Sequence, residues 1–244
     1  MTFSILAYDA ETGRLGSGAA TGSLCVGGWV LRGDLASGLS ASQGTAPSTV
    51  WGEGVLERMR NGLSAAEAVS QTTGGDAGRA YRQLAAIGPR GGTAAFTGTE
   101  SVPACGHRQA ENVIVSGNML TGEEVLDAIL DNFLASSGSF HKRILNALTA
   151  GDAAGGDSRG LMSAAMLVIG HDMPPLTLRV DYSETPLADL RDLHSRATTG
   201  AYAEWMNLVP TVQTPERAPT PEDIARLSVP ADPEDDTPAP FVET

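Results

Sequence analysis

The sequence contains little lysine, few cysteines and few aromatic residues. Its 244 residues include 16 basic and 29 acidic side chains, Lys142 is the only lysine, and the formal net charge is −13. Binding to a phosphate backbone requires clustered Lys and Arg side chains. No such cluster is present, so the sequence argues against a nucleic-acid partner. Cys25 and Cys105 fit neither a metal-binding spacing nor a disulfide framework.

Long apolar runs and targeting signals are also missing. No stretch of 18 apolar residues occurs, so we predict no membrane-spanning helix. The first residues have neither the basic segment nor the cleavage site of a secretory signal. We therefore expect a cytoplasmic protein that does not contact a membrane. No motif indicates a metal or a cofactor, and we expect none.

Apolar residues (41%) and glycine (29 residues) are abundant, and this composition favours a sizeable core of strands joined by many turns. Residues 211–244 differ, because they carry eight acidic against two basic residues and seven of the 14 prolines. Acidic, proline-rich segments bury too little apolar surface to offset chain entropy. We therefore predict a folded domain over 1–209 and a largely extended or disordered tail over 210–244. One short helix is predicted in the tail, with Thr220 as cap and Pro221 in its first turn.

Hydrophobic periodicity predicts strands, two helices, strands, two helices, strands and a last helix. A capping box, Ser64 to Glu67, marks one helix start. The run 164–169 is apolar throughout, as in a strand covered on both faces. We predict an α+β fold, a four-layer αββα sandwich of two stacked, mainly antiparallel sheets with helices outside. Strands are predicted at 3–8, 15–20, 27–32, 35–41, 81–87, 93–96, 112–115, 161–169 and 176–182, and helices at 50–60, after Ser64, after a cap at 121–124, at about 144–151 and at 185–207.

The residue after Met1 is the first candidate for chemistry. A side chain as small as that of Thr2 is compatible with removal of Met1, which leaves Thr2 with a free α-amine. A hydroxyl beside its own amine is a nucleophile with an adjacent base, and such amines titrate at about 7.7–8.0 in model peptides. Strand alternation places Ser4 on the same face as Thr2, with Phe3 on the other face. These two polar residues would form a cleft wall, although many proteins begin Met-Thr without such a role.

A glycine-rich loop at 151–160 joins a predicted helix to a predicted buried strand. A phosphate-binding loop runs from strand to helix and contains Lys, so this loop does not match one. Asp157 and Arg159 would together fix a substrate carboxylate or orient a catalytic group, or would simply pair with each other in a turn. The glycines at 16–22 open no helix, which argues against a dinucleotide site and favours close sheet packing.

Other polar residues lie where strands end. Asn118 closes a strand before a helix, where its amide would donate to an oxyanion or cap the turn. His107, next to Arg108, is a candidate general base or a structural hydrogen-bonding residue. Gln43 follows a predicted strand and would face the same cleft or satisfy loop backbone groups.

Several motifs, in a fixed order over residues 1 to about 195, resemble one family. They are Met1–Ile5, Arg82–Leu84, Ala94–Gly98, Gly106–Arg108, Gly117–Leu120, Ala153–Gly160 and Leu178–Asp181. The sequence is similar to the bacterial and archaeal family known as domain of unknown function 1028. That family is placed in the N-terminal-nucleophile (Ntn) hydrolase superfamily, which has a four-layer αββα fold. The resemblance implies an amide-bond hydrolase and adds weight to Gln43, His107, Asn118, Asp157 and Arg159.

We therefore expect hydrolysis of a small amido or ureido compound by Thr2. The alternatives are a catalytically silent fold that binds a small molecule or acts in assembly, and an enzyme whose nucleophile is Cys25 or Ser4. We further expect a homodimer. The predicted site comprises Thr2, Asn118, Asp157 and Arg159 as catalytic residues and Ser4, Gln43, His107 and Arg108 as substrate-binding residues.

Overall fold

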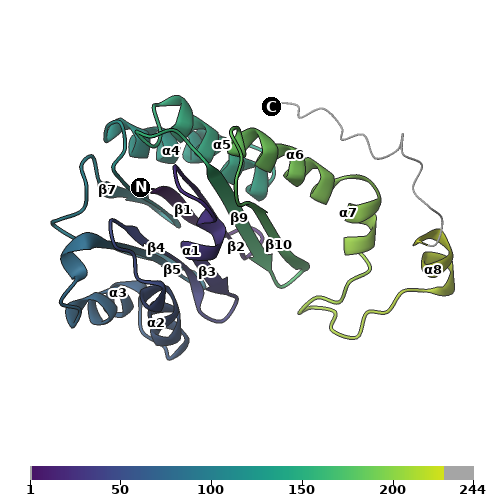
Figure 1. The fold of residues 1–244 in the computed structure, drawn as a ribbon. Helices are drawn as coiled ribbons and strands as arrows, with labels where there is room; N and C mark the ends of the chain where they lie inside the picture. Colours follow the sequence, from purple (N-terminus) through teal and green to yellow (C-terminus); the bar gives the residue numbers. More distant parts are fainter. Residues whose placement is uncertain (1, 228–244) are drawn as a thin grey trace.

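The protein is described here by a computed structural model that places residues 2–227 (Figure 1). This part of the chain forms two antiparallel sheets that stack face to face. The six-stranded sheet has the order β10-β9-β2-β1-β8-β7, and the four-stranded sheet has the order β3-β4-β5-β6. The first contains β1 (Thr2–Asp9), β2 (Arg14–Thr21), β7 (Gly106–Ala110), β8 (Val113–Asn118), β9 (Ser163–Gly170) and β10 (Met173–Val180), and the second β3 (Leu31–Asp34), β4 (Gly38–Gly44), β5 (Arg82–Gly88) and β6 (Gly91–Thr97).

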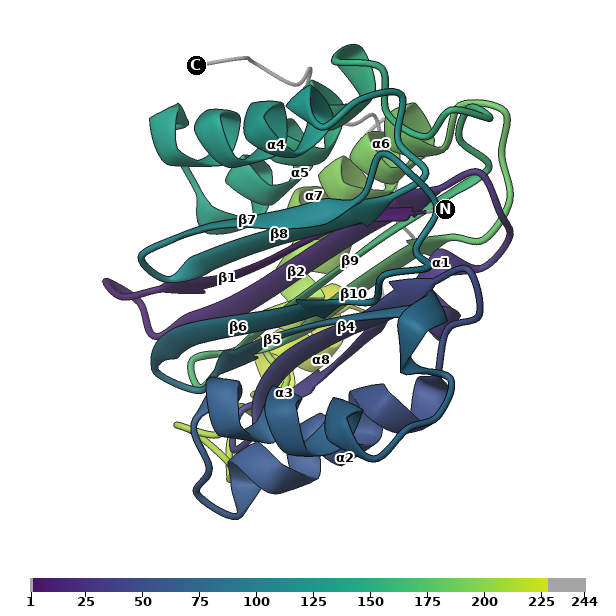
Figure 2. The same ribbon diagram turned by 90° about the vertical axis from the view of Figure 1, so that its left-hand side faces the viewer.

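Helices cover the outer face of each sheet, so that the layers follow one another as helices, sheet, sheet and helices (Figure 2). The helices α4 (Glu124–Ala135) and α5 (Phe140–Ala153) pack on the six-stranded sheet, with α6 (Pro186–Thr198) beside them. The helices α2 (Thr49–Arg60) and α3 (Ala65–Gly74) pack on the four-stranded sheet. The predicted pair of antiparallel sheets with helices outside is therefore present in the structure.

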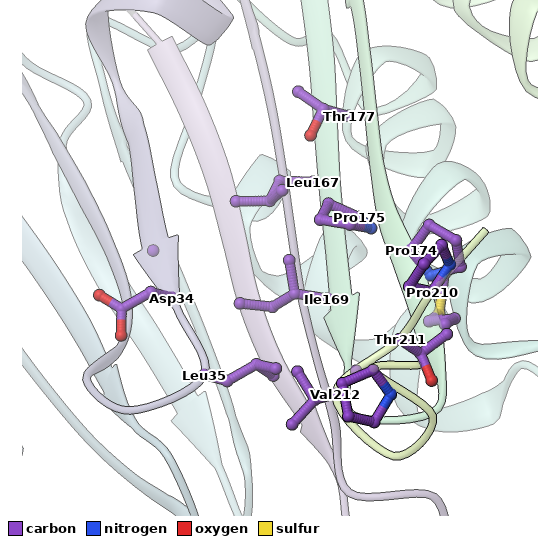
Figure 3. A pocket seen from close by; sticks show the side chains of 14 residues that line it. Asp34, Leu35, Leu167, Ile169, Pro174, Pro175, Thr177, Pro210, Thr211 and Val212 are labelled. Carbon is purple, nitrogen blue, oxygen red and sulfur yellow. The ribbon is translucent and has the colours of Figure 1, made fainter. Parts of the chain in front are cut away.

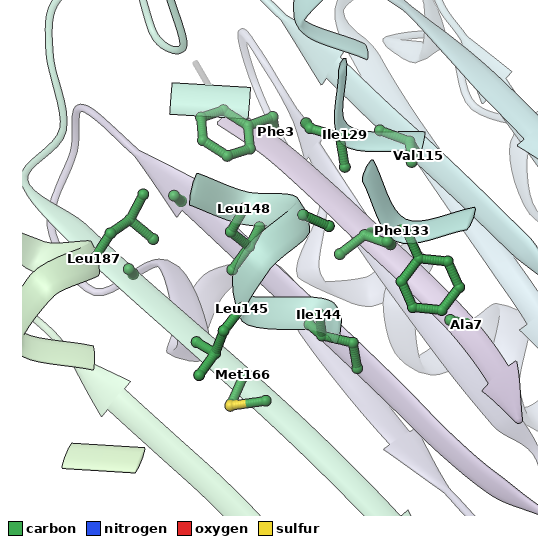
Figure 4. Close-up of a cluster of buried hydrophobic side chains, with 14 of the residues drawn as sticks. Phe3, Ala7, Val115, Ile129, Phe133, Ile144, Leu145, Leu148, Met166 and Leu187 are labelled. Atoms are coloured by element: carbon green, nitrogen blue, oxygen red, sulfur yellow. The ribbon is translucent and has the colours of Figure 1, made fainter. Parts of the chain in front are cut away.

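The largest apolar cluster lies between the six-stranded sheet and its helices (Figure 4). Phe3 of β1 and Ile144 of α5 are both fully buried there. A Cβ on Gly16 would lie 2.4 Å from Ile144 Cδ1, and one on Gly18 would lie 2.8 Å from Leu148 Cδ1. These two glycines of β2 therefore allow α5 to lie directly against the sheet. The close packing predicted for this glycine-rich strand is thus made with a helix.

A second apolar cluster fills the space between the sheets and includes Leu6, Leu39 and Ile114. Strand alternation in β1 separates the two clusters, because Phe3 points to the helices while Leu6 points to the other sheet. Ser4 also points to the other sheet, since its hydroxyl donates to Gln43 of β4. The predicted division of the faces of β1 is confirmed.

Most differences from the predicted elements occur where the chain changes layer. A strand is predicted at 27–32, but the chain forms the short helix α1 (Val26–Trp29) before β3. Cys25 adopts a left-handed backbone conformation with φ 60°, and the Val26 N–H donates to Ser163 Oγ at 3.1 Å. These contacts turn the chain from one sheet towards the other. Strand β7 has no counterpart among the predicted strands.

Two helices also differ from the predicted ones. The predicted helix over 185–207 is divided into α6 and α7 (Gly200–Met206), because Thr199 is extended and Gly200 has a φ of 63°. The predicted cap at 121–124 is absent, since α4 begins after Glu123, whose side chain makes no capping hydrogen bond. By contrast, the capping box of Ser64 and Glu67 at the start of α3 is confirmed.

The chain after α7 returns to the β9–β10 end of the six-stranded sheet, where residues of the predicted tail line a cavity, and it ends, in the described part, at α8 (Pro221–Leu227). This helix was predicted, and Thr220 and Asp223 exchange hydrogen bonds at its start as expected. Before it, the Gln213 N–H donates to the carbonyl oxygen of His171, at the turn between β9 and β10. The rest of the predicted tail, residues 228–244, lies outside the described residues.

Candidate active site

A cavity of about 540 Å³ opens at one end of the space between the sheets. Thr2 and Thr21 line it from the six-stranded sheet, and Gln43 lines it from β4. The segment around α1 forms a wall, and Arg159 comes from the loop that precedes β9. Three of the residues predicted from the sequence, Thr2, Gln43 and Arg159, therefore meet at one cavity.

Thr2 begins the strand β1, which lies between β2 and β8 inside the six-stranded sheet. Only 6% of the residue is exposed. Its hydroxyl donates to Thr21 Oγ1 at 3.2 Å, and its backbone lies opposite Asn118 of the neighbouring strand β8. The hydroxyl is thus held by a central strand, which fixes its position more firmly than a loop would.

A chain of buried amides lies beneath Thr2 and connects the two sheets. Gln83 Nε2 donates to the carbonyl oxygen of Gly117 at 2.8 Å, so Gln83 Oε1 faces the other way as an acceptor. That oxygen accepts from Asn118 Nδ2 at 2.8 Å and from Gln43 Nε2 at 3.2 Å. Gln43 Nε2 also donates to the carbonyl oxygen of Thr2 at 3.3 Å, and Gln43 Oε1 accepts from Ser4 Oγ at 2.9 Å.

Backbone carbonyl oxygens only accept hydrogen bonds, so they fix which end of each amide is oxygen and which is nitrogen. The carbonyl of Gly117 orients Gln83, and Gln83 in turn orients Asn118. Asn118 therefore uses an N–H on Gln83, while its Oδ1 is fully buried and has no hydrogen-bond partner among the described residues. An unsatisfied buried acceptor costs about 1–3 kcal/mol, so its retention needs a reason.

Gln83 is a site residue that the sequence reasoning missed. It was noted only as part of a family motif, although a polar residue inside an otherwise apolar strand is a detectable signal. Its exposed fraction is 1%. Gln83 links Gln43, Asn118 and the backbone of β8, and this pairing between two sheets has no trace in local sequence.

Asp157 and Arg159 form the ion pair that the sequence allowed. Asp157 is 3% exposed, and its carboxylate accepts from the Gly22 N–H at 2.6 Å and from the Arg159 N–H at 2.9 Å. The Arg159 guanidinium approaches the same carboxylate at 3.2 Å. Asp157 lies behind Arg159, which lines the cavity, and fixes the loop against the end of β2.

The structure does not bring His107 and Arg108 to this cavity. Both lie on the edge strand β7. Arg108 packs against α4, where hydrogen bonds to Asp127 and Glu123 raise its pKa. His107 is exposed, and its pKa is lowered by partial desolvation and by the charge of Arg108. Ser4 and Asn118 are buried in the amide network under the cavity and do not line it.

A larger cavity, of about 690 Å³, lies at the opposite end of the same space (Figure 3). Its walls are mainly apolar: Leu167 and Ile169 come from β9, two prolines from β10, and Val212 from the chain after α7. Asp34 is its only ionisable lining residue in the described chain. The hydroxyl of Thr2, the amide of Gln43 and the guanidinium of Arg159 converge at the smaller cavity, which is therefore the candidate site.

No three His, Cys, Asp or Glu side chains of residues 2–227 come together as a metal would require. None of the helices described in this range has both the length and the apolar character needed to cross a bilayer.

Comparison with known proteins places the chain in a family. Residues 2–190 match the model of the family of unknown function DUF1028. A crystal structure of a DUF1028 protein from Silicibacter pomeroyi is similar, with 53% sequence identity, a TM-score of 0.87 and coverage of 90% of this chain and 96% of that one. No curated protein matches the chain. By its sequence over 189 residues and by its fold, the chain belongs to the DUF1028 family.

Proposed function

We propose that the protein is an amide-bond hydrolase that uses Thr2 as an N-terminal nucleophile after removal of Met1. The observation that carries the proposal is the position of Thr2, at the buried start of a central strand and in the wall of a cavity that it shares with Gln43 and Arg159. The helix, sheet, sheet, helix layering supports it, because the sequence resembles a family placed among Ntn hydrolases, and these enzymes share that layering. The substrate is a small molecule that fits a cavity of about 540 Å³.

The reaction proceeds in two steps. The Thr2 hydroxyl attacks the amide carbonyl and passes its proton to the Thr2 α-amine. The carbon–nitrogen bond breaks, the leaving amine takes that proton, and the acyl group remains on Thr2 as an ester. A water molecule then gives a proton to the same amine and attacks the ester carbonyl; the bond from the acyl carbon to Thr2 Oγ breaks, the proton passes from the amine to Oγ, and a carboxylic acid is released.

The amide network supports a specific role for Asn118. Its free Oδ1 lies on the strand paired with Thr2, on the face shared by the two side chains. This oxygen accepts a hydrogen bond from an N–H of the liberated, neutral α-amine and so orients the amine lone pair towards the hydroxyl. The oxyanion contact expected of Asn118 from the sequence is not part of this proposal, because Asn118 does not line the cavity. Gln83 is the positioning residue that holds the Asn118 side chain.

The two other nucleophiles considered from the sequence are less well placed. The Ser4 hydroxyl is 1% exposed and donates to Gln43. Cys25 caps the start of α1 and does not line the cavity. Thr2 combines a hydroxyl with a position in the cavity wall, and it is therefore preferred over both.

Mass spectrometry and kinetics together test the proposal. We expect the intact mass of the native protein to lack one methionine residue, and a panel of acylated amino acids, ureido acids and muropeptide fragments to include a substrate. Thr2→Ala then loses at least about 1,000-fold in kcat/KM, while Thr2→Ser retains part of the activity and Thr12→Ala, in an exposed turn, retains all of it.

Complete retention of Met1 in the native organism would exclude the free amine and favour the alternative of a catalytically silent binding protein. Inactivation by a thiol-blocking reagent would instead point to Cys25. Unchanged activity of Thr2→Ala would refute Thr2 as the nucleophile.

A further inference from the structure

The charge of the cavity at Thr2 differs from that of the whole chain. The sequence has 29 acidic residues and a net charge of −13. Nevertheless, the described residues that line this cavity include one cation, Arg159, and no aspartate or glutamate. A surface of this net charge repels small anions in general. The described lining of the cavity therefore presents a guanidinium and no carboxylate to an anionic group, with the carboxylate of Asp157 buried behind the guanidinium.

Arg159 is held in one orientation. Its Nε and Nη2 atoms donate to Asp157 at 3.3 Å and 3.2 Å, and Nη2 also donates to Ser23 Oγ at 3.2 Å. Asp157 is itself fixed by the Gly22 N–H. Among the described residues none accepts from Nη1. A guanidinium whose stem is fixed and whose remaining N–H groups reach a cavity matches a planar carboxylate, because little side-chain entropy is lost on binding.

The wall of the cavity formed by the segment around α1 is apolar. Leu24 and Trp29 line it and are 53% and 55% exposed. Val26 and Val30, on the same segment, add smaller apolar surface. Exposed large apolar side chains beside a few directed polar groups are typical of a small-molecule site, in which apolar walls bind part of the ligand and polar groups set its orientation.

We propose that the ligand of this cavity is an amide that carries a free carboxylate and an apolar side chain, as an N-acylated apolar amino acid does. The carboxylate binds the Arg159 guanidinium, the apolar side chain lies against Leu24 and Trp29, and the amide carbonyl lies at Thr2. Cleavage of this amide rests on the proposed function, whereas recognition of the carboxylate rests on Arg159 alone.

Calorimetry with the full-length Thr2→Ala protein tests recognition without turnover. The probes are N-acetylphenylalanine, its methyl ester and its primary amide, which differ in the carboxylate. We expect the acid to bind at least about tenfold more tightly than either neutral compound, with an affinity that falls as salt is added. Because all three measurements use the same protein, the comparison does not depend on how a variant of Arg159 folds.

Substitution of the arginine then locates the effect. Arg159→Lys keeps a charge beside the buried Asp157 and should remove most of the preference for the acid. Arg196→Gln is the control, since this arginine is similarly exposed, pairs with Asp192 and lies on α6 outside the cavity lining. It should leave the preference unchanged.

The outcomes separate this inference from the proposed function. Equal affinity for acid and ester, no binding of any of the three probes, or a preference that survives Arg159→Lys would each overturn the carboxylate assignment. Binding of the acid without hydrolysis by the wild-type protein would support the ligand class while counting against the hydrolase. Hydrolysis of neutral amides with no preference for acids would support the hydrolase and overturn the carboxylate assignment.

Discussion

The two ends of the space between the sheets are built by the same strands but have opposite chemistry. At one end, Thr21 of β2 pairs with Ser163 of β9, beside the cavity at Thr2 and the amide network. At the other end, the same two strands pair Leu15 with Ile169, beside the apolar cavity. Apolar packing is sufficient to hold two sheets together, as the second end demonstrates.

The polar end therefore needs a separate explanation. A buried amide destabilises a fold unless its hydrogen bonds are made, and here the amides bond to one another and to the backbone carbonyls of Gly117 and Thr2. Asn118 Oδ1 is the exception among the buried amide atoms of this network. Under the proposed function, the buried polar groups at this end position Thr2 for chemistry, and the apolar end has no such requirement.

The largest effect on stability is expected at the apolar end. Ile169 is nearly buried between the sheets and lines the apolar cavity. Ile169→Ala should lower the free energy of unfolding by about 2–4 kcal/mol, because it removes packed atoms and enlarges the cavity. Chemical denaturation measures this change, and kcat/KM should stay within about twofold of wild type. Val212→Ala, at a 62% exposed position on the same cavity, should change stability by less than about 0.5 kcal/mol. A large loss of activity in Ile169→Ala would show that the two ends are coupled.

At the polar end, a substitution should lower activity as well as stability. Gln83→Leu leaves the carbonyl of Gly117 and the amides of Asn118 and Gln43 without their partner. We expect a loss of about 1–3 kcal/mol in stability together with at least a tenfold fall in kcat, because Asn118 is no longer oriented. Gln109→Leu is the matched control, since Gln109 lies exposed on β7 and accepts a hydrogen bond from Thr93. A fall in stability with unchanged kcat would reduce Gln83 to a structural residue.

A third effect comes from pH and acts away from both ends. His141 and His194 contact each other between α5 and α6, and burial, followed by nearby positive charges, holds the pKa of each well below its ordinary value. As pH falls below about 6.5, the unfolded chain takes up protons that the folded pair does not, so stability falls by up to about 1.4 kcal/mol per pH unit for each histidine. Above that pH this contribution is fully present.

Denaturation at pH 7 and pH 5.5 measures the difference. The double substitution of His141 and His194 by leucine should flatten the pH dependence, and His171→Asn, at an exposed position, should not. If the free energy of unfolding of the double variant depends on pH as steeply as that of the wild type, this histidine pair is not the cause of the pH dependence. The comparison of the two sheet ends is therefore best made above pH 6.5.

Much of the site could be anticipated from local patterns. Alternation in β1 places Thr2 and Ser4 on the inner face, and a two-residue spacing is enough to pair Asp157 with Arg159. A polar residue in the apolar strand at Gln83 was a detectable signal, but its partners and the unpaired oxygen of Asn118 could not be anticipated, because their contacts join two sheets and span 35 residues. Arg108 was placed with the site by its motif, yet its strand turns it towards α4.

The sequence alone predicted the alternation of strands and helix pairs and the two faces of β1, whereas the separation of the acidic tail stays a prediction. Each of these follows from side-chain periodicity or composition, which is local. Only the tertiary structure decided that β1 lies between β2 and β8, that Gln43 and Gln83 meet under Thr2, and that His107 lies elsewhere. Strand order and the stacking of sheets depend on contacts between distant segments, and no local pattern encodes which of those contacts will form.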